Sequence, residues 1–390
     1  GEDWVFDCLF PVPGATGGEA RAVAETVSFP LLQERTHHVA APTLAVRCSV
    51  PSELRHAPEA AVTHIRLVRS PRAPRSMPAV GGQLDSGLFV PLRPFARRHV
   101  KTAMCTQAAW DFDFLQRRVP GHVEFWFRYH LEVLGVDEVY LYDFDGSFRE
   151  VSFLSELRDQ GRVIYEDGLG LMLPLPDIIG QHGLQTYTAY FAQTAVQQHC
   201  WQQARHNADW VISVSHGWDM FLFSPHGESL DQLLERLPPG EAVVVESVRY
   251  GSGDGIDTSE HPNAFGRFPF RVDLAVRPED FGSPSERVLI APPRLVAGSV
   301  LSEFMPRTEA PLASALGHSV EFMPPRMRHP HALDKNVWRA NHYVHLFEKR
   351  GALFASEEQS RQLQHFVHHD AAAAALGDIL AASWSPSGSA

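Results

Sequence analysis

Short apolar runs alternate with helix-like segments from Arg98 onward, and this alternation limits the fold more than any other feature of the chain. Segments 148–159 and 185–206 are interpreted as helices, and residues from Trp126 to Leu134 show the i, i+3, i+4, i+7, i+8 spacing of a helical stripe. The apolar runs are interpreted as strands: 100–106, 137–142, 162–165, 209–214 and 242–248. This rhythm predicts an α/β domain with a mostly parallel sheet and helices on both faces.

Residues 1–98 have a different pattern, in which short β-branched runs are separated by proline and glycine. This spacing predicts a small antiparallel β domain, and segment 70–82 has the composition of a linker. A chain of 390 residues suits two domains. We therefore expect a β-rich accessory domain with its linker over 1–98, a main α/β domain over 99–370 and a low-complexity tail over 371–390.

The C-terminal third has weaker signals. Runs at 288–290, 320–322 and 340–344 are candidate strands, and 357–369 is a candidate helix. The tail is rich in Ala and then in Ser, Pro and Gly, which predicts only partial order.

The chain carries a net charge of −12, from 34 basic and 46 acidic side chains. A nucleic-acid-binding protein needs a basic face, so this balance argues against that class. A small anionic ligand such as a nucleotide remains open, because local fields can oppose the global one. No apolar run reaches the roughly 18 residues of a membrane span. The sequence begins with Gly rather than Met, so we expect that the native start, with any membrane anchor, has been cut away.

The four cysteines include no Cys-x-x-Cys pair, which argues against a thiolate zinc site. Cys8 and Cys48 share the N-terminal region and could form a disulfide in a secretory lumen. Four buried thiols, with Cys105 and Cys200 included, are the equal alternative.

An acidic residue follows a buried strand in segment 209–225. The apolar run 210–214 is followed by Ser215, His216, Gly217, Trp218 and Asp219, and then by a second apolar patch at 220–223. Ligands of open α/β sheets bind at the carboxyl ends of the strands. Asp219 is therefore the strongest single candidate for a ligand-binding carboxylate.

A series of short motifs runs along roughly residues 99–350. They are Val100–Gln107, Glu124-Phe-Trp126 with Tyr129-His130, Leu141-Tyr-Asp143 with Gly146-Ser147, the long helix with Cys200, Gly217-Trp-Asp219 with Phe221 to Pro225, Arg249 to Gly253, His261-Pro262 and Asn341-His342-Tyr343. In this order they resemble family 92 glycosyltransferases, the group that includes pectic galactan synthases. Such enzymes have the Rossmann-like GT-A fold and transfer a sugar, usually galactose, from a UDP donor to a glycan with inversion.

The resemblance implies that 99–370 is a GT-A catalytic domain of an enzyme of cell-wall or glycan biosynthesis. It implies that 1–98 corresponds to the β-rich domain of the plant members, which is thought to contact glycan. It further implies a Golgi-lumenal type II membrane protein whose anchor lies outside this chain, and a homodimer.

The resemblance also implies a metal site for Mn²⁺ or Mg²⁺, because a divalent cation stabilises the charge that develops on the leaving diphosphate. The usual motif is Asp-x-Asp, and this chain has Gly217-Trp218-Asp219. Asp219 and His342 are the expected metal ligands. His216 is the candidate substitute for the missing first acid.

The expected donor-binding residues are Thr106, Gln107, Asp143, Gly217, Arg249, Gly251, Ser252 and Arg271. Thr106, Gln107 and Asp143 would contact uracil and ribose, although Asp143 could instead start a turn with Gly146 and Ser147. The Gly-rich stretch 249–255 is interpreted as a loop close to the ligand or as a plain flexible loop. Arg271 would hold phosphate charge or solvate a strand face.

An inverting transfer requires a carboxylate that takes the acceptor proton. Asp254, Asp257 and Glu260 are the candidates, and the sequence does not choose among them. A second hypothesis is a protein of the same fold that has lost catalysis and binds glycan or a partner. The missing first acid, and Phe144 where the family has Asn, favour this hypothesis. A Ser-His-Asp hydrolase is discounted, because no Gly-x-Ser-x-Gly elbow occurs.

Overall fold

The computed structural model describes residues 6–11, 19–28, 44–48, 51–54, 64–69, 88–91, 98–167, 193–204, 207–214, 217–238, 240–251, 263–274, 287–293, 331–343 and 367–383. The chain divides into two compact units, Gly1–Arg98 and His99–Ala390. Within the described ranges, no helix is both long and apolar enough to cross a membrane.

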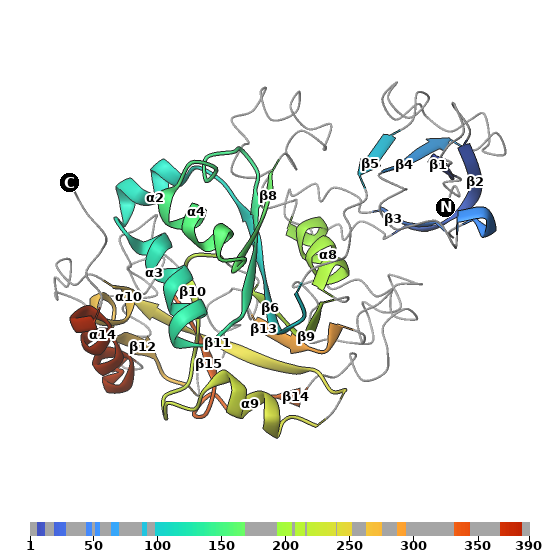
Figure 1. Ribbon diagram of the computed structural model, residues 1–390. Helices are drawn as coiled ribbons and strands as arrows, with labels where there is room; N and C mark the ends of the chain where they lie inside the picture. Colours follow the sequence, from blue (N-terminus) through green and yellow to red (C-terminus); the bar gives the residue numbers. More distant parts are fainter. Residues whose placement is uncertain are drawn as a thin grey trace, which may run out of the picture. The chain divides into compact units, whose positions relative to one another are not determined.

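The first unit is a five-stranded antiparallel sheet in the order β3-β2-β1-β4-β5 (Figure 1). Its elements are β1 (Phe6–Pro11), β2 (Glu19–Ser28), β3 (Leu44–Cys48), a short 3₁₀ helix (Ser52–Leu54), β4 (His64–Arg69) and β5 (Leu88–Pro91). A disulfide joins Cys8 of β1 to Cys48 of β3, the two strands that pair with β2, and the Cα–Cα distance is 5.9 Å. Of the two alternatives for these cysteines, the structure has the disulfide.

The second unit contains a larger sheet with the strand order β10-β15-β11-β13-β9-β6-β7-β8, to which β12, β14 and β16 are added through β11. The strands are β6 (Val100–Ala109), β7 (Glu138–Asp143), β8 (Val163–Asp167), β9 (Ala208–Val214), β10 (Met220–Phe223), β11 (Val243–Gly251), β12 (Phe270–Val272), β13 (Arg287–Ala291), β14 (His331–Ala332), β15 (Arg339–His342) and β16 (Val367–His369). Among the described strands, only β10, β12 and β13 run against the others. The prediction of a mixed α/β domain with a mostly parallel sheet is confirmed.

The strands β8, β7, β6 and β9 form a parallel set in which the chain starts at the centre. It runs outward from β6 through β7 to β8, and then returns to the other side of β6 at β9. This is the 3-2-1-4 order of a Rossmann-like doubly wound sheet, which has its topological switch point between the first and fourth strands. The switch point therefore lies where β6 and β9 separate.

Helices cover both faces of this parallel set (Figure 1). On one face lie α2 (Phe112–Arg118), α3 (His122–Arg128), its π-helical continuation (Tyr129–Val133) and α4 (Ser152–Asp159), and on the other lies α8 (Gln193–Ala204). Three further helices lie beside the rest of the sheet: α9 (Leu230–Arg236), α10 (Ala264–Arg267) and α14 (Ala371–Ser383). Helices α2 to α4 share a core with Met104, Val139 and Leu141, whereas α8 packs with Cys105 and Tyr140. Neighbouring residues of a strand point to opposite faces, so two separate cores result.

Helix α3 hydrogen-bonds to the outer edge of β10 through its side chains. His122 Nε2 donates to the Trp218 carbonyl at 2.5 Å, Trp126 Nε1 to the Met220 carbonyl at 2.8 Å, and the Tyr129 hydroxyl to the Leu222 carbonyl at 2.6 Å. The donors are spaced i, i+4, i+7, one face of a helix. The acceptors are alternate residues, Trp218 in the turn before β10 and Met220 and Leu222 within it. The predicted helical stripe from Trp126 to Leu134 therefore has a second role besides packing. Two of its residues, Trp126 and Tyr129, donate hydrogen bonds to backbone carbonyls of the edge strand β10.

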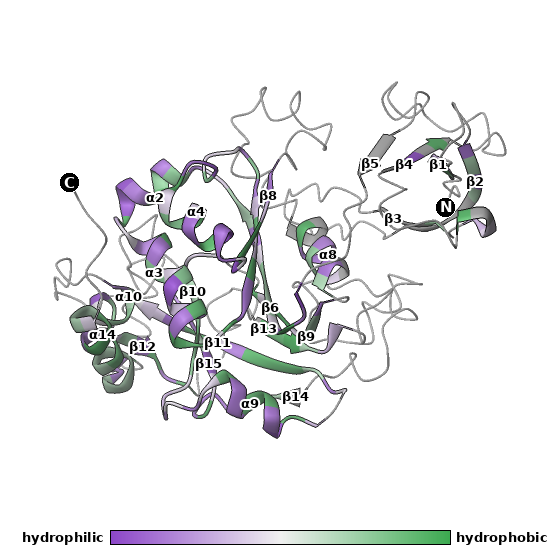
Figure 2. Ribbon diagram, viewed as in Figure 1, coloured by the Kyte–Doolittle hydropathy of each residue, from purple (hydrophilic) through white to green (hydrophobic). Residues whose placement is uncertain are grey.

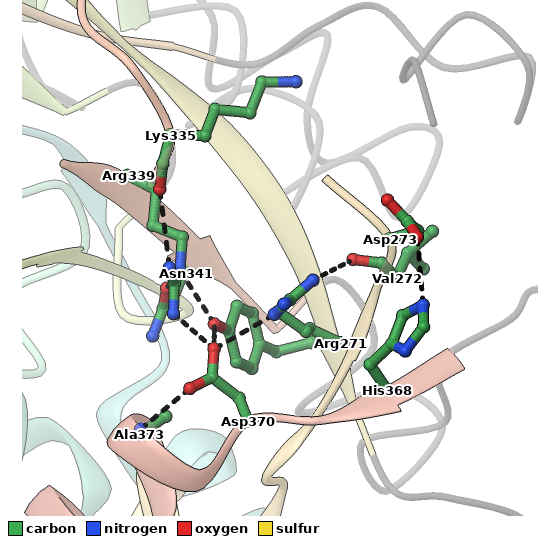
Figure 3. A network of polar contacts seen from close by, with 10 residues as sticks. Arg271, Val272, Asp273, Lys335, Arg339, Asn341, His368, Asp370 and Ala373 are labelled. Atoms are coloured by element: carbon green, nitrogen blue, oxygen red, sulfur yellow. Dashed lines mark hydrogen bonds and ion pairs between the residues drawn. The ribbon is translucent and has the colours of Figure 1, made fainter. Parts of the chain in front are cut away.

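Asp370 lies at the centre of a polar network that joins the C-terminal helix to the sheet (Figure 3). One carboxylate oxygen accepts hydrogen bonds from Arg339 of β15, from Arg271 Nε of β12 at 3.2 Å and from the Tyr250 hydroxyl of β11 at 2.6 Å. The other accepts from the Ala373 amide at 3.0 Å and caps α14. Burial opposes ionisation, but the Tyr250 hydroxyl and the Arg339 charge hold the pKa of Asp370 below its usual range.

Helix α14 changes the predicted domain boundary. Most of its residues are apolar (Figure 2), and it packs on α10 so closely that a Cβ at Gly377 would lie 2.4 Å from the Gly266 amide nitrogen. The side chain of Asn263 also donates to the Gly377 carbonyl at 2.8 Å. The second unit therefore continues beyond residue 370 into the segment that was predicted as a low-complexity tail.

Two local predictions are wrong. Residues 367–369 form strand β16 rather than the end of a helix, because they pair with β12. Residues 249–251 continue strand β11 rather than starting a loop, because Tyr250 and Gly251 pair with Arg271 and Phe270. The candidate strand 320–322 and the segments 185–192 and 357–366 of the predicted helices lie outside the described residues.

Candidate functional site

The carboxyl ends of β6 and β9 separate at the switch point. Their ladder ends at the pair Cys105 and Ser213. On its other side, β6 has a register shift against β7 between Cys105 and Ala108. The shift is a bulge with one extra residue, and such irregularities re-aim side chains next to active sites. The extra length falls at Thr106 and Gln107, two residues that the sequence assigns to the donor site.

Thr106 has a structural role in this bulge. Its side chain is fully buried, and the single proton of its hydroxyl lies between two acceptors, the Tyr140 carbonyl at 2.9 Å and the Gln107 carbonyl at 3.0 Å. A buried hydroxyl with protein partners does not reach a ligand in the crevice. The prediction that the Thr106 side chain contacts the donor is therefore wrong.

Gln107 extends toward Gly217, the residue at the first position of the Asp-x-Asp-like triplet. A Cβ built on Gly217 would lie 2.8 Å from Gln107 Nε2 and 3.1 Å from Gln107 Cγ. A side chain at position 217 would therefore require the Gln107 side chain to shift. Two predicted donor-site residues, one after each central strand, thus meet across the switch point.

Asp219 and His342 also meet. His342 Nε2 lies 3.4 Å from an Asp219 carboxylate oxygen. The strand pair β10–β15 brings them together: Met220 is opposite His342, and the Tyr343 amide donates to the Asp219 carbonyl at 2.8 Å. The His342 side chain is 2% exposed and that of Asp219 is 19% exposed, so only the carboxylate is open to solvent.

His122 belongs to the same region, and the sequence analysis missed it. Its hydrogen bond to the Trp218 carbonyl holds the backbone next to Asp219. Burial lowers the pKa of His122 to about 4, although the Trp218 carbonyl and the Asp219 charge act in the opposite direction. The imidazole is therefore neutral at pH 7. The i, i+4, i+7 spacing of His122, Trp126 and Tyr129 was the available signal.

The two predicted donor-site arginines, Arg249 and Arg271, have different surroundings. Arg249 lies opposite His342 in the β11–β15 ladder and is half-buried, so the strand register places it beside the Asp219–His342 pair. Arg271 is bound by the buried carboxylate of Asp370. This pairing favours a structural role for Arg271, and its contact with ligand phosphate stays a prediction. Gly251 is buried within β11, so the prediction of a ligand-facing loop glycine is wrong.

The Asp143 carboxylate accepts hydrogen bonds from other groups of the protein. The donors are the Gly146 and Phe148 amides, both at 2.9 Å, and the Tyr165 hydroxyl. The residue is fully buried, and burial raises the pKa of its carboxyl group. The structure thus has the turn-starting alternative, and the prediction of a uracil or ribose contact is wrong.

The remaining predicted site residues, His216, Ser252, Asp254, Asp257 and Glu260, lie outside the described residues. Among the described ones, no group of three or more His, Cys, Asp or Glu side chains could hold a metal ion. Asp219 and His342 together supply one oxygen and one nitrogen ligand. Two protein ligands leave the other positions of a cation to water and substrate phosphates.

A separate open groove of about 580 Å³ lies beside α9. It is lined by His226, Gly227, Glu228, Gln232, Arg236 and Val337. None of the predicted site residues lines it. It lies toward the Phe223–Arg339 end of the β10–β15 ladder, opposite the Met220–His342 end.

Comparison with known proteins adds little. No family model matches the chain, and no curated protein matches it. One solved structure with some likeness is 4-diphosphocytidyl-2C-methyl-D-erythritol synthase from Anaerococcus prevotii, with 12% sequence identity and a TM-score of 0.28 over 69% of this chain and 96% of that one. A likeness at this level carries no argument about function.

Proposed function

We propose that the second unit is a metal-dependent glycosyltransferase that transfers a hexose, most readily galactose, from a UDP-sugar to a glycan with inversion. The observation that carries the proposal is the path of Gly217–Asp219. Its first residue meets Gln107 at the switch point, and its last meets His342. Gly217 to Met220 form a turn, with a hydrogen bond from the Met220 amide to the Gly217 carbonyl at 3.4 Å. This one turn joins the switch point, where a nucleotide would bind, to the Asp219–His342 pair, where its diphosphate would lie.

The residues at the site have separate roles in binding the nucleotide, the cation and the diphosphate. Gln107 lies where a nucleotide binds a doubly wound sheet. Asp219 and His342 hold the cation, which stabilises the charge that develops on the leaving diphosphate. Arg249 adds positive charge beside them. His122 keeps the Asp219 backbone in place.

The transfer itself is a single displacement. The acceptor hydroxyl oxygen attacks the anomeric carbon and the bond from that carbon to the diphosphate oxygen breaks, so UDP leaves. One carboxylate takes the hydroxyl proton. Asp254, Asp257 and Glu260 remain the proposed bases, and the order of motifs resembling family 92 glycosyltransferases supports the choice of reaction.

The compartment is part of the proposal. All four cysteines form disulfides, Cys8–Cys48 and Cys105–Cys200. Disulfides persist in oxidising compartments, which supports a Golgi-lumenal enzyme. The glycan-binding role of residues 1–98 and the homodimer rest on the resemblance.

Calorimetric titration with UDP tests the proposal, with Mn²⁺ or with EDTA. We expect binding that depends on the cation, and turnover with one member of a panel of UDP-sugars. Asp219→Ala should weaken the Mn²⁺-dependent part by at least about tenfold, the equivalent of roughly 1.4 kcal/mol. Asp113→Ala, at an exposed position of α2, is the matched control. Equal UDP affinity in Asp219→Ala and the unchanged protein would refute the assigned role.

One observation favours the second candidate, a binding protein without turnover. The first acid of the usual motif is replaced by Gly217, and Gln107 occupies the space beside it. Metal-independent UDP binding without transfer to any acceptor would support this candidate over the enzyme.

A further inference from the structure

The side chain of Gln197 joins the two strands that separate at the switch point. Its Nε2 donates to the Thr106 carbonyl of β6 at 3.3 Å and to the Val214 carbonyl of β9 at 3.0 Å. Its Oε1 accepts from the Ser213 hydroxyl. The residue is only 4% exposed. One amide group on α8 thus contacts three residues at the carboxyl ends of both central strands.

These contacts occur where the ladder stops. The last β6–β9 pair is Cys105 with Ser213, so Thr106 and Val214 are the first residues beyond it. Val214 still pairs with Val288 of β13 on its other side, but neither carbonyl has a partner in the β6–β9 ladder. Buried acceptors without a partner are a condition that proteins avoid. The Gln197 amide satisfies both carbonyls and occupies the space between the strands. The distance between the ends of β6 and β9 therefore depends on the size of the Gln197 side chain.

A covalent bond fixes α8 in this position. Cys200, three residues after Gln197 in the helix, forms a disulfide with Cys105 of β6, and the Cα–Cα distance is 5.8 Å. Residues three apart lie on the same helix face. The disulfide holds that face against β6 one residue before the bulge, so the amide cannot withdraw from the strand ends.

We propose that Gln197 is a positioning residue: it sets the separation of β6 and β9 at the switch point and keeps the β6 bulge that directs Gln107 toward Gly217. The role of this geometry in nucleotide affinity rests on the proposed function. Gln197 acts through Gln107 and the strand ends, because its own polar atoms are used by Thr106, Val214 and Ser213.

The test compares Gln197→Met with Gln203→Met, a matched substitution on the same helix. Met keeps the length of the side chain but removes both donors. Amide hydrogen exchange on the whole chain is measured for peptides covering 104–109 and 211–218. We expect exchange there to rise at least about tenfold in Gln197→Met, with peptides from β7, β11 and β15 unchanged, and no change in Gln203→Met.

The affinity for UDP is the second readout. We expect it to fall at least about tenfold in Gln197→Met while the far-ultraviolet spectrum is kept. Ser213→Ala is a milder variant, which removes only the hydroxyl that orients the amide. It should give a smaller change in the same two peptides, and it keeps the proposal testable if Gln197→Met fails to fold.

The outcomes separate the two proposals. Unchanged exchange at 104–109 and 211–218 in Gln197→Met, or in Ser213→Ala if the first variant is unfolded, overturns the positioning role. A uniform rise across the second unit shows a merely structural role and also overturns it. If the unchanged protein binds no UDP, the proposed function fails, and the exchange result still decides whether Gln197 positions the strand ends.

Discussion

At the scale of single residues, the site depends on the protonation states of buried histidines. His122 and His130 are both buried, and burial lowers the pKa of His122 to about 4 and that of His130 to about 3. Both imidazoles are neutral in the folded protein at pH 7. His122 then donates to the Trp218 carbonyl, next to the proposed metal-binding carboxylate. Protonation of His122 therefore acts on the site and on stability together.

The pH dependence has a definite sign. The unfolded protein has histidines of ordinary pKa near 6.5, so it takes up protons before the folded protein as the pH falls. The contribution of His122 to stability is complete above pH 6.5 and is lost as the pH falls toward 4. The shift corresponds to roughly 3 kcal/mol for this one group.

We expect His122→Gln to reduce this dependence, because an amide can still donate to the Trp218 carbonyl but does not titrate. The measurement is the free energy of urea unfolding at several pH values between 7 and 4. His226→Gln, at an exposed position, is the control. A slope as steep in His122→Gln as in the unchanged protein would contradict the assignment.

At the scale of elements, the Asp370 network explains how the C-terminal helix supports the site. Arg339 and His342 are the first and last residues of β15. Asp370 binds Arg339 at one end of that strand, and Asp219 meets His342 at the other. The helix α14 is thus connected to His342, the proposed metal ligand, through a single short strand.

Asp370→Asn should be strongly destabilising, because it leaves the buried Arg339 guanidinium without a counter-charge. Removing one partner of a buried ion pair is worth on the order of 3–5 kcal/mol. The measurement is the free energy of unfolding in urea. Asp378→Asn, at an exposed position of the same helix, is the matched control and should change it by less than about 0.5 kcal/mol. A loss of similar size in both variants would show that the network contributes nothing specific.

At the scale of the whole molecule, each of the two units has its own disulfide. We expect two calorimetric transitions, one for each unit. Replacing Cys8 and Cys48 together by Ala should lower the free energy of unfolding of the first unit alone, by roughly 3–4 kcal/mol in the chain-entropy estimate for a loop of this length. Only one of the two transition temperatures should therefore fall. UDP affinity should be unchanged. A shift of both transitions by the same amount would contradict independent units.

The sequence predicts the parts of this molecule that depend on local pattern. The strands β6, β7, β8 and β9 were found because short apolar runs reflect burial on both faces of a parallel sheet. Contacts between distant segments were not predictable. Nothing near Arg271 in the sequence shows that Asp370 neutralises it, and nothing near Asp143 distinguishes a turn from a ligand site.

The same limit applies to the candidate site. Asp219 was found from its place after a strand, and His342 from a resemblance. Their contact depends on the β10–β15 register. His122 was missed because its partner is a backbone carbonyl 96 positions away. Every residue has a backbone carbonyl, so the residue types do not show which carbonyl is the partner. Gln197 was missed for the same reason, since two of its three partners are carbonyls.

The outer margin of β10 is where a second polypeptide would ordinarily add itself to such a sheet. Here a histidine, a tryptophan and a tyrosine already saturate its alternate acceptors. An extended peptide that approached this margin would have to displace three buried donors before it gained a single bond. Self-association through β10 is thereby disfavoured, and the chain beside Asp219 stays in one register whatever the protein concentration.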